Sequence, residues 1–500
     1  MPSVDPDFLA LPLREIAAAA LAEASALGAS HADVRVHRLR TGLLSARDAR
    51  VEAMSDSTVL GLAVRVVWEG TWGFAAGSAL SAQAGEALAR QAIAVARVSA
   101  PLNTDPVALA AEPVHADVTW VSDYEIDPFE VPLSERFDLV LGRDARLLAA
   151  DGVHHVDSSL HTVKECTYYA DLAGTSTTQQ RVRCRYSVRA THIGDGGFEA
   201  MRTIAPPVGR GWEFVTGATG YDHDAELDAL PALLAEKVAA PTVDPRRYDL
   251  VIDPSNLWLT IHESIGHATE LDRALGYEAN YAGTSFATPD KLGTLQYGTP
   301  LLNVTGDRTA RNGLATVGYD DDGVETQSWD LVRDGILVGY QTDRRIAKHA
   351  GLDRSNGCAY ADSPLHIPIQ RMANVSIAPL AGGPSTDELI AGVEDGIYIV
   401  GDKSWSIDMQ RYNFQFTGQR FFRIRNGQLA GMVKDVAYQA TTTDFWGSMV
   451  AIGGPQTWVL GGAFNCGKAQ PGQVAPVSHG CPTAVFENIN VLNALAEAGL

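Results

Sequence analysis

Positive charge is scarce in this chain of 500 residues, in which 39 Lys and Arg stand against 60 Asp and Glu. The formal charge of -21 would repel the phosphates of DNA or RNA and the anionic face of a membrane. Long apolar runs are also missing: no segment supplies the ~18 uncharged apolar residues of a spanning helix, and the N-terminal stretch lacks a basic leader. We therefore expect no nucleic-acid partner, no membrane partner and a cytoplasmic protein.

Cysteine is rare, and no CxxC pair occurs. An odd set of five thiols suits a reducing compartment better than a disulfide framework. A cysteine with a chemical role is then expected to be a metal ligand or a nucleophile. The GxSxG elbow of serine hydrolases is also missing. The five thiols are Cys166, Cys184, Cys358, Cys466 and Cys481.

The remaining composition is that of an ordinary globular protein. Hydrophobic residues make up 46% and charged residues 20%, which excludes collagenous and disordered chains. Because a single hydrophobic core usually stops growing at roughly 250 residues, the length predicts at least two domains. A small binding module is excluded.

The first half of the chain mixes helical and strand patterns. Apolar residues at helical spacing predict helices over 7–27 and 81–98, and strand-like runs occupy 31–38 and 61–68. Two-fold alternation around turn signals predicts antiparallel strands over 155–220. An N-terminal mixed α/β domain is expected.

A segment with two prolines and no periodicity, AAPTVDPRR at 239–247, is the best linker candidate and divides the chain into domains 1–240 and 241–500. Beyond it, Asp-Gly at 334–335 and Asn-Gly at 426–427 are hairpin signals. A capping box from Ser385 to Glu388 predicts one helix that stops near residue 396. The expected fold class is α+β, with a mostly antiparallel β domain in the C-terminal half.

That second domain should carry a helix with an unusual histidine pattern. A strand at 248–252 leads to Asp253, a suitable N-cap, and to Pro254 at the first helical position. His262 and His267 follow as H-E-x-x-x-H. On a regular α-helix positions i and i+5 lie ~140° apart, too far around the cylinder for both imidazoles to bind one ion.

A locally widened π-type turn, with Gly266 as a suitable place for it, would bring the two imidazoles together. They could then bind zinc, while Glu263 takes a proton from the water that the metal activates. The alternative interpretation is two histidines on the helix surface beside a solvated glutamate.

A catalytic zinc needs a third protein ligand, and the residues leave several candidates open. Glu270 and Asp272 are near in sequence, whereas Cys466, His479 and Cys481 are distant but chemically suitable. For any one cysteine, a small buried hydrophobe is the usual role.

Three contiguous acids, Asp320 to Asp322, precede Gly323. Their contiguity lacks the alternate spacing of an EF-hand loop, so a solvated hairpin turn is expected instead of a calcium site.

Several motifs together resemble the TldD/PmbA family of metallopeptidases, on its TldD side, which carries HExxxH. They are HESIGHATELD, the distal NCGK, LVRDGILVGYQTDRRIA, NGCAYADSPLHIPIQRMANVSI, VEDGIYI and GLAVRVVWEGTWGFA. The resemblance implies that His262, His267 and Cys466 bind Zn²⁺ and that Glu263 is catalytic. It also implies an N-terminal α/β domain and an antiparallel β domain.

The same resemblance implies hydrolysis of unfolded or small peptides by a dimer. The expected partner is a homologous subunit that lacks the motif, with a homodimer as the alternative. A different function, a catalytically silent peptide-binding or scaffolding subunit, is disfavoured by the intact His262, Glu263 and His267.

Overall fold

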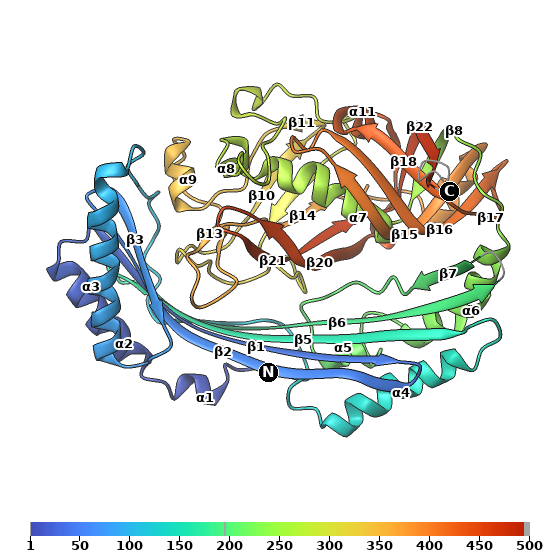
Figure 1. The fold of residues 1–500 in the computed structure, drawn as a ribbon. Helices are drawn as coiled ribbons and strands as arrows, with labels where there is room; N and C mark the ends of the chain where they lie inside the picture. The colour runs from blue at the N-terminus through green and yellow to red at the C-terminus, as the bar shows by residue number, and fades with distance from the viewer. Residues whose placement is uncertain (1, 195–196, 495–500) are drawn as a thin grey trace.

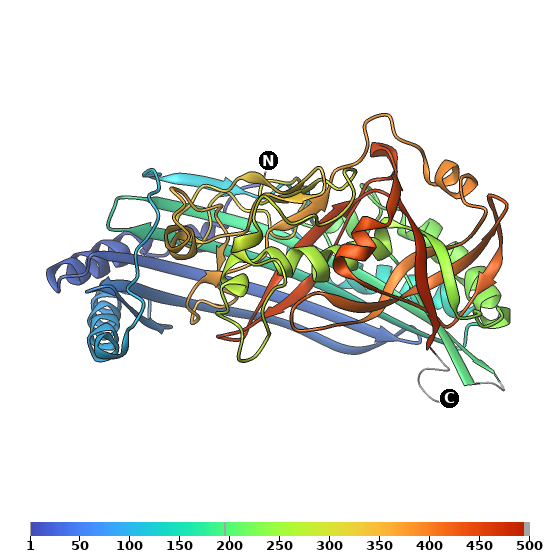
Figure 2. The same cartoon turned by 90° about the horizontal axis from the view of Figure 1, so that it is seen from above.

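The computed structural model describes residues 2–194 and 197–494 and is α+β, as the sequence predicts. An N-terminal sheet with strand order β3-β2-β1-β5-β6-β4, and with β7 paired to β6, runs beneath the C-terminal half of the chain (Figures 1 and 2). Its elements are α1 (Pro6–Leu9), α2 (Leu13–Ala26), β1 (His31–Arg47), β2 (Arg50–Trp68), β3 (Thr71–Gly77), α3 (Ala82–Ser99), β4 (Val118–Val121), α4 (Leu133–Leu148), β5 (His155–Asp171), β6 (Ser176–Gly194), β7 (Gly197–Arg202), α5 (Trp212–Val215) and α6 (His223–Ala239).

The strands of this sheet are much longer than the apolar runs that predicted them. β1 and β2 have 17 and 19 residues and are joined by Asp48 and Ala49, both with positive φ, as in the two-residue hairpins that match strand twist. Residues 50–59, at the start of β2, are exposed and carry no apolar alternation, so the sequence pattern misses them.

Two other sequence predictions are corrected. The helix expected over 7–27 is interrupted, because Pro12 precedes the first turn of α2 and α1 ends at Leu9. The strands expected over 155–220 end at Arg202, and the chain then forms a loop and α5.

The two faces of the N-terminal sheet differ in chemistry. One face packs apolar side chains of β5 and β6, including Leu160 and Tyr186, against α4 and α6, while α2 and α3 cover the other end of the sheet. The opposite face meets the C-terminal half and is rich in buried charge, as at Arg35, Arg65 and Arg181. Helices therefore cover one face of the sheet, and the other face contacts the C-terminal half largely through buried charged side chains.

The three contiguous acids at 320–322 belong to this charged interface, which corrects the expected solvated turn. Asp321 accepts a hydrogen bond from Arg35 at 2.7 Å, and Asp322 accepts one from Arg65 at 2.6 Å. Asp320 is 1% exposed. The turn is buried because β1 and β2 supply guanidinium groups for two of its carboxylates.

The C-terminal half forms a small closed sheet in which β15, β8, β22, β18 and β16 pair in order and β16 returns to β15. All these pairings are antiparallel except β8 with β15. Its elements are β8 (Arg246–Ile252), α7 (Pro254–Ile261), α8 (Leu271–Ala274), β9 (Val304–Asp307), β10 (Ser328–Arg333), β11 (Ile336–Leu337), α9 (Arg344–His349), β12 (Ala359–Tyr360), β13 (Ile369–Gln370), β14 (Asn374–Ile377), α10 (Thr386–Ala391), β15 (Asp395–Ile407), β16 (Asn413–Arg425), β17 (Gln428–Val433), β18 (Val436–Thr441), α11 (Thr442–Gly447), β19 (Met449–Ile452), β20 (Val459–Lys468), β21 (Gln473–Cys481) and β22 (Ala484–Asn493).

Local signals in this half are borne out in detail. The capping box of Ser385 and Glu388 opens α10, which ends at Ala391, earlier than expected. Both hairpin signals connect paired strands, β10 to β11 and β16 to β17. The division of the chain between residues 240 and 241 stays a prediction. Among the described residues no helix combines the length and hydropathy that crossing a bilayer requires.

The largest apolar core surrounds α7. It joins side chains of α7, such as Leu257 and Ile261, to aromatic residues of the closed sheet such as Phe416 and Tyr438. The β20–β21 hairpin contacts α7 as well. This packing brings the end of α7 close to residues that are some 200 positions later in the chain.

Candidate metal centre

The helix that carries the histidines is formed as its sequence predicts. Asp253 caps α7 by accepting the Ser255 N–H at 2.9 Å, and Pro254 occupies the first turn. After Ile261 the backbone widens into a π-helical turn over 262–266, where the N–H of His267 bonds to the carbonyl of His262. The predicted π-type turn is thus present.

Gly266 allows close packing of this turn against Met372. A Cβ at this position would lie 2.6 Å from Sδ and 2.9 Å from Cε of Met372, closer than side chains approach one another. A side chain at 266 would therefore force the end of the Met372 side chain to move.

The widened turn and β20 bring His262, His267 and Cys466 together. One potential ligand atom from each lies within 4.8 Å of the other two, and all three residues are buried. The His267 Nε2 to Cys466 Sγ distance is 3.6 Å, and the two imidazole centroids are 4.7 Å apart. Spacing alone could not show this convergence, because Cys466 comes from a strand 199 positions away.

In both His262 and His267 the ring nitrogen Nδ1 is already engaged in a hydrogen bond. His479 Nδ1 lies 2.9 Å from the Val375 carbonyl, which only accepts, so its Nε2 must accept the Nδ1–H of His262 at 2.7 Å. His267 Nδ1 donates to Glu270 Oε2 at 2.7 Å. Both Nε2 lone pairs are left for a metal, the arrangement usual for metal-binding histidines.

The spacing of the donors fits a small tetrahedral ion. With metal–nitrogen bonds of about 2.05 Å and a metal–sulfur bond of about 2.3 Å, tetrahedral nitrogen and sulfur ligands should lie ~3.6 Å apart. The 3.6 Å between His267 Nε2 and Cys466 Sγ agrees with this value. Two neutral imidazoles and one thiolate are donors that zinc prefers, and they leave a fourth position open.

Electrostatics favour the thiolate. Burial alone would raise the pKa of Cys466, but His267, when its Nε2 is protonated, and then Arg371 outweigh it and hold the pKa below its ordinary value. Arg371 also donates a hydrogen bond to the Cys466 carbonyl. The sulfur is thus predisposed to the ionised form that binds a metal.

The other candidate ligands lie outside the cluster. Glu270 and His479 orient the two histidines through hydrogen bonds. Asp272 accepts a hydrogen bond from Lys468 at 2.7 Å, and the Sγ of Cys481 is directed at the Pro254 carbonyl, 3.7 Å away.

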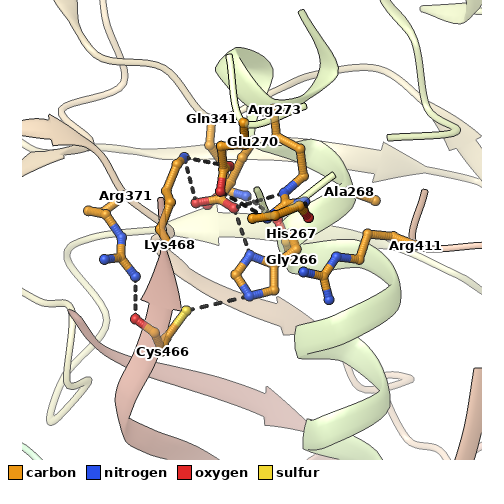
Figure 3. A network of polar contacts seen from close by, with 12 residues as sticks. Gly266, His267, Ala268, Glu270, Arg273, Gln341, Arg371, Arg411, Cys466 and Lys468 are labelled. Carbon is orange, nitrogen blue, oxygen red and sulfur yellow. Dashed lines mark hydrogen bonds and ion pairs between the residues drawn. The ribbon is translucent and has the colours of Figure 1, made fainter. Parts of the chain in front are cut away.

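Lys468, two residues after Cys466, holds the Glu270 carboxylate in place. Its Nζ donates to Glu270 at 3.1 Å (Figure 3). It also donates to Asp272 at 2.7 Å, and Glu278 lies 3.6 Å away. Burial opposes ionisation of Glu270, yet Lys468 and His267 keep its pKa well below the ordinary value. An ionised Glu270 is the acceptor that keeps the proton on Nδ1 of His267.

Glu263 has a cationic partner that the sequence did not indicate. Nη1 of Arg411 lies 2.5 Å from Glu263 Oε2, and both side chains are largely buried. Arg411 has φ of 65° in a tight turn between β15 and β16, where Asp408 accepts backbone N–H groups of Gln410, Tyr412 and Asn413. Neither its spacing nor its neighbours in sequence distinguish this arginine from others.

A buried donor set of two histidines from the π-turn region and a cysteine from β20, with a carboxylate beside the first histidine, defines a metallopeptidase-type metal centre. Residues 245–493 match the model of the PmbA/TldA metallopeptidase C-terminal domain, and residues 32–96 match that of PmbA/TldA metallopeptidase domain 1. The chain therefore belongs to the PmbA/TldD family of metallopeptidases.

Curated relatives resemble the chain over much of its length. A metalloprotease of Methanothermobacter thermautotrophicus is 26% identical over 92% of this chain and 95% of that protein. A zinc metalloprotease TldD homolog of Saccharolobus solfataricus is 26% identical over 54% of this chain and 57% of that protein.

A solved structure has the same fold. TldE from Thermococcus kodakarensis superposes with a TM-score of 0.69 over 94% of this chain and 98% of that chain, at 14% identity.

Proposed function

We propose that this chain is a zinc-dependent peptidase in which Glu263 is the general base. The observation that carries the proposal is the convergence of His262, His267 and Cys466, each with a potential ligand atom within 4.8 Å of the other two. A zinc ion held there would supply a Lewis acid that lowers the pKa of water and polarises the scissile carbonyl. The name of the Saccharolobus relative supports zinc as the metal.

Glu263 is placed to move the protons of the reaction. Arg411 holds Oε2 in an ion pair at 2.5 Å, while no hydrogen bond from the described residues reaches Oε1. Oε1 can therefore accept the proton of the attacking water and then donate it to the departing amine. The carboxylate follows His262 directly, which keeps it beside the metal ligands.

Glu263→Gln is the direct test of the general base. The variant should retain bound zinc and lose kcat by roughly 10²- to 10⁴-fold, the usual contribution of general acid–base catalysis. Glu487→Gln, on the exposed surface of β22, is the matched control. Zinc content by mass spectrometry and peptide hydrolysis are measured on the same samples. If the Glu263→Gln variant hydrolysed peptides at a near-normal rate, Glu263 would not be the general base.

We propose that the substrates are small or unfolded peptides. β20, which carries Cys466, pairs with β21 along one side only among the described residues. A free strand edge can bind an extended chain by main-chain hydrogen bonds, which demands an unfolded segment and little sequence. Equal rates of degradation for a stably folded domain and for its denatured form would contradict this.

The cellular setting is also proposed. All five cysteines are buried and free, which supports a cytosolic enzyme. We infer a dimer with a homologous subunit that lacks HExxxH, or alternatively a homodimer, because a covered site would admit only threaded chains. Light scattering and activity with and without the homologue test this, and a fully active monomer would contradict it.

A further inference from the structure

A cavity of about 230 Å³ lies where the N-terminal sheet meets the metal-binding half. β6 and β7 supply Arg185 and Arg202 from the sheet, and β15 supplies Asp402 and Lys403. Trp258 of α7 and residues 461–463 of β20 also line the cavity. The cavity thus joins both halves of the chain.

The cavity carries an excess of positive charge. Arg202 is paired with Asp402 at 2.9 Å, but the side chains of Arg185 and Lys403 make no hydrogen bond or ion pair with any described residue. Burial and then repulsion from Arg202 lower the pKa of Arg185, and Asp402 only partly opposes them. Arg185 is half-buried without a side-chain partner, and the exposed Lys403 adds a second positive charge to the lining, so an anionic ligand would complement the cavity.

The cavity is also close to the metal centre. The indole of Trp258 is stacked on His479, with centroids 6.2 Å apart, and its centroid lies 6.3 Å from that of His262. On β20, Ala463 precedes Cys466 by three residues. Since an extended strand rises ~3.3 Å per residue, an extended peptide lying along β20 would place a residue in the cavity roughly three positions from the bond at the metal.

We propose that this cavity is a subsite that binds a carboxylate of the peptide substrate, with Arg185 as the specificity-determining residue. The carboxylate belongs to an Asp or Glu side chain, or to the C-terminus, about three residues from the scissile bond. An arginine without a partner offers parallel N–H donors that match a carboxylate. This inference rests on the proposed peptidase function, whose substrate class it narrows.

The test compares unstructured peptides that differ only by Glu or Gln at the third position on either side of the cleaved bond. A second pair differs only in a C-terminal acid or amide, which separates the two sources of the carboxylate. The zinc-loaded enzyme should prefer one acidic peptide over its neutral counterpart by roughly tenfold or more in kcat/KM, the effect of one charge-assisted hydrogen bond.

Arg185→Gln should abolish that preference, and Arg185→Glu should reverse it in favour of a Lys-containing peptide. Arg189→Gln is the matched control, because Arg189 lies on the same strand but is exposed and paired with Asp157 at 3.0 Å. The control should keep the wild-type preference. Equal cleavage of acidic and neutral peptides by the wild-type enzyme would overturn the inference, as would an equal loss with both peptides in Arg185→Gln.

A binding measurement separates this inference from the peptidase proposal. Calorimetric titration of the same peptides into Glu263→Gln protein needs no turnover, and tighter binding of the acidic peptide than of the neutral one supports the subsite. Equal affinities would overturn it. Failure of the zinc-loaded wild-type protein to hydrolyse any peptide would instead count against the proposed function.

Discussion

His479 offers a test of how the metal centre is organised, because it contacts a ligand without being one. Its Nε2 accepts the Nδ1–H of His262 at 2.7 Å, and this bond directs the free lone pair of His262 into the donor cluster. Burial, and then the nearby His262, hold the pKa of His479 well below its ordinary value, so the ring stays a neutral acceptor. His479→Ala removes the acceptor and leaves a buried N–H without a partner.

The size of the effect follows from that single hydrogen bond. An unsatisfied buried donor costs about 1–3 kcal/mol, and loss of such supporting partners typically weakens metal binding 10- to 100-fold. We therefore expect His479→Ala to weaken zinc affinity by roughly 10- to 100-fold, or about 1.4–2.8 kcal/mol. His479→Gln, whose amide oxygen can accept from His262, should recover part of the loss.

Zinc affinity is measured by competition with a chelator, alongside thermal unfolding of the metal-free proteins to account for any change in the fold. Cys481→Ala is the matched control, since Cys481 is equally buried on the same strand but lies outside the donor cluster. The reasoning is refuted if His479→Ala binds zinc as tightly as Cys481→Ala does.

Three further predictions follow from other groups. Cys466→Ala should lower zinc content, measured by mass spectrometry, whereas Cys481→Ala should not. The opposite result would mean that Cys481, and not Cys466, is the third ligand. Arg411→Gln should lower kcat roughly tenfold while zinc stays bound, because Glu263 loses its partner; unchanged kcat would contradict this. Burial raises the pKa of Asp144 to about 7 in the folded protein. In the unfolded chain this carboxyl loses its proton at a lower pH, so the free energy of unfolding should fall by up to about 1.4 kcal/mol per pH unit as the pH rises from roughly 4 to 7. Asp144→Asn should therefore stabilise the fold at pH 8, with a gain that shrinks towards pH 5; a gain independent of pH, measured by denaturant unfolding, would contradict the assignment.

Local features of this protein are determined by its sequence. The i, i+5 spacing of His262 and His267 cannot serve one ion on a regular helix, and this predicted the π-turn that the structure contains. The cap at Asp253 and the capping box at Ser385 were equally readable, because each depends on side chains within a few residues of the backbone that they bind. The α+β class followed from such local patterns.

The choice of the third donor was decided only by the tertiary structure. Cys466 and Cys481 are both buried thiols on neighbouring strands, but the packing of the β20–β21 hairpin on α7 directs only Cys466 at the histidines. Glu270 and His479, which chemistry alone allowed as ligands, instead fix the imidazoles.

Arg411 and the buried acids at 320–322 had no usable local signal. Arg411 reaches Glu263 across 148 positions, and Asp322 reaches Arg65 across 257. An exposed turn and a buried turn can share one sequence pattern, since the difference lies in the surface that the rest of the chain packs against it. Contacts within a few residues depend on spacing, which the sequence contains, whereas contacts across hundreds of residues depend on how the two halves pack.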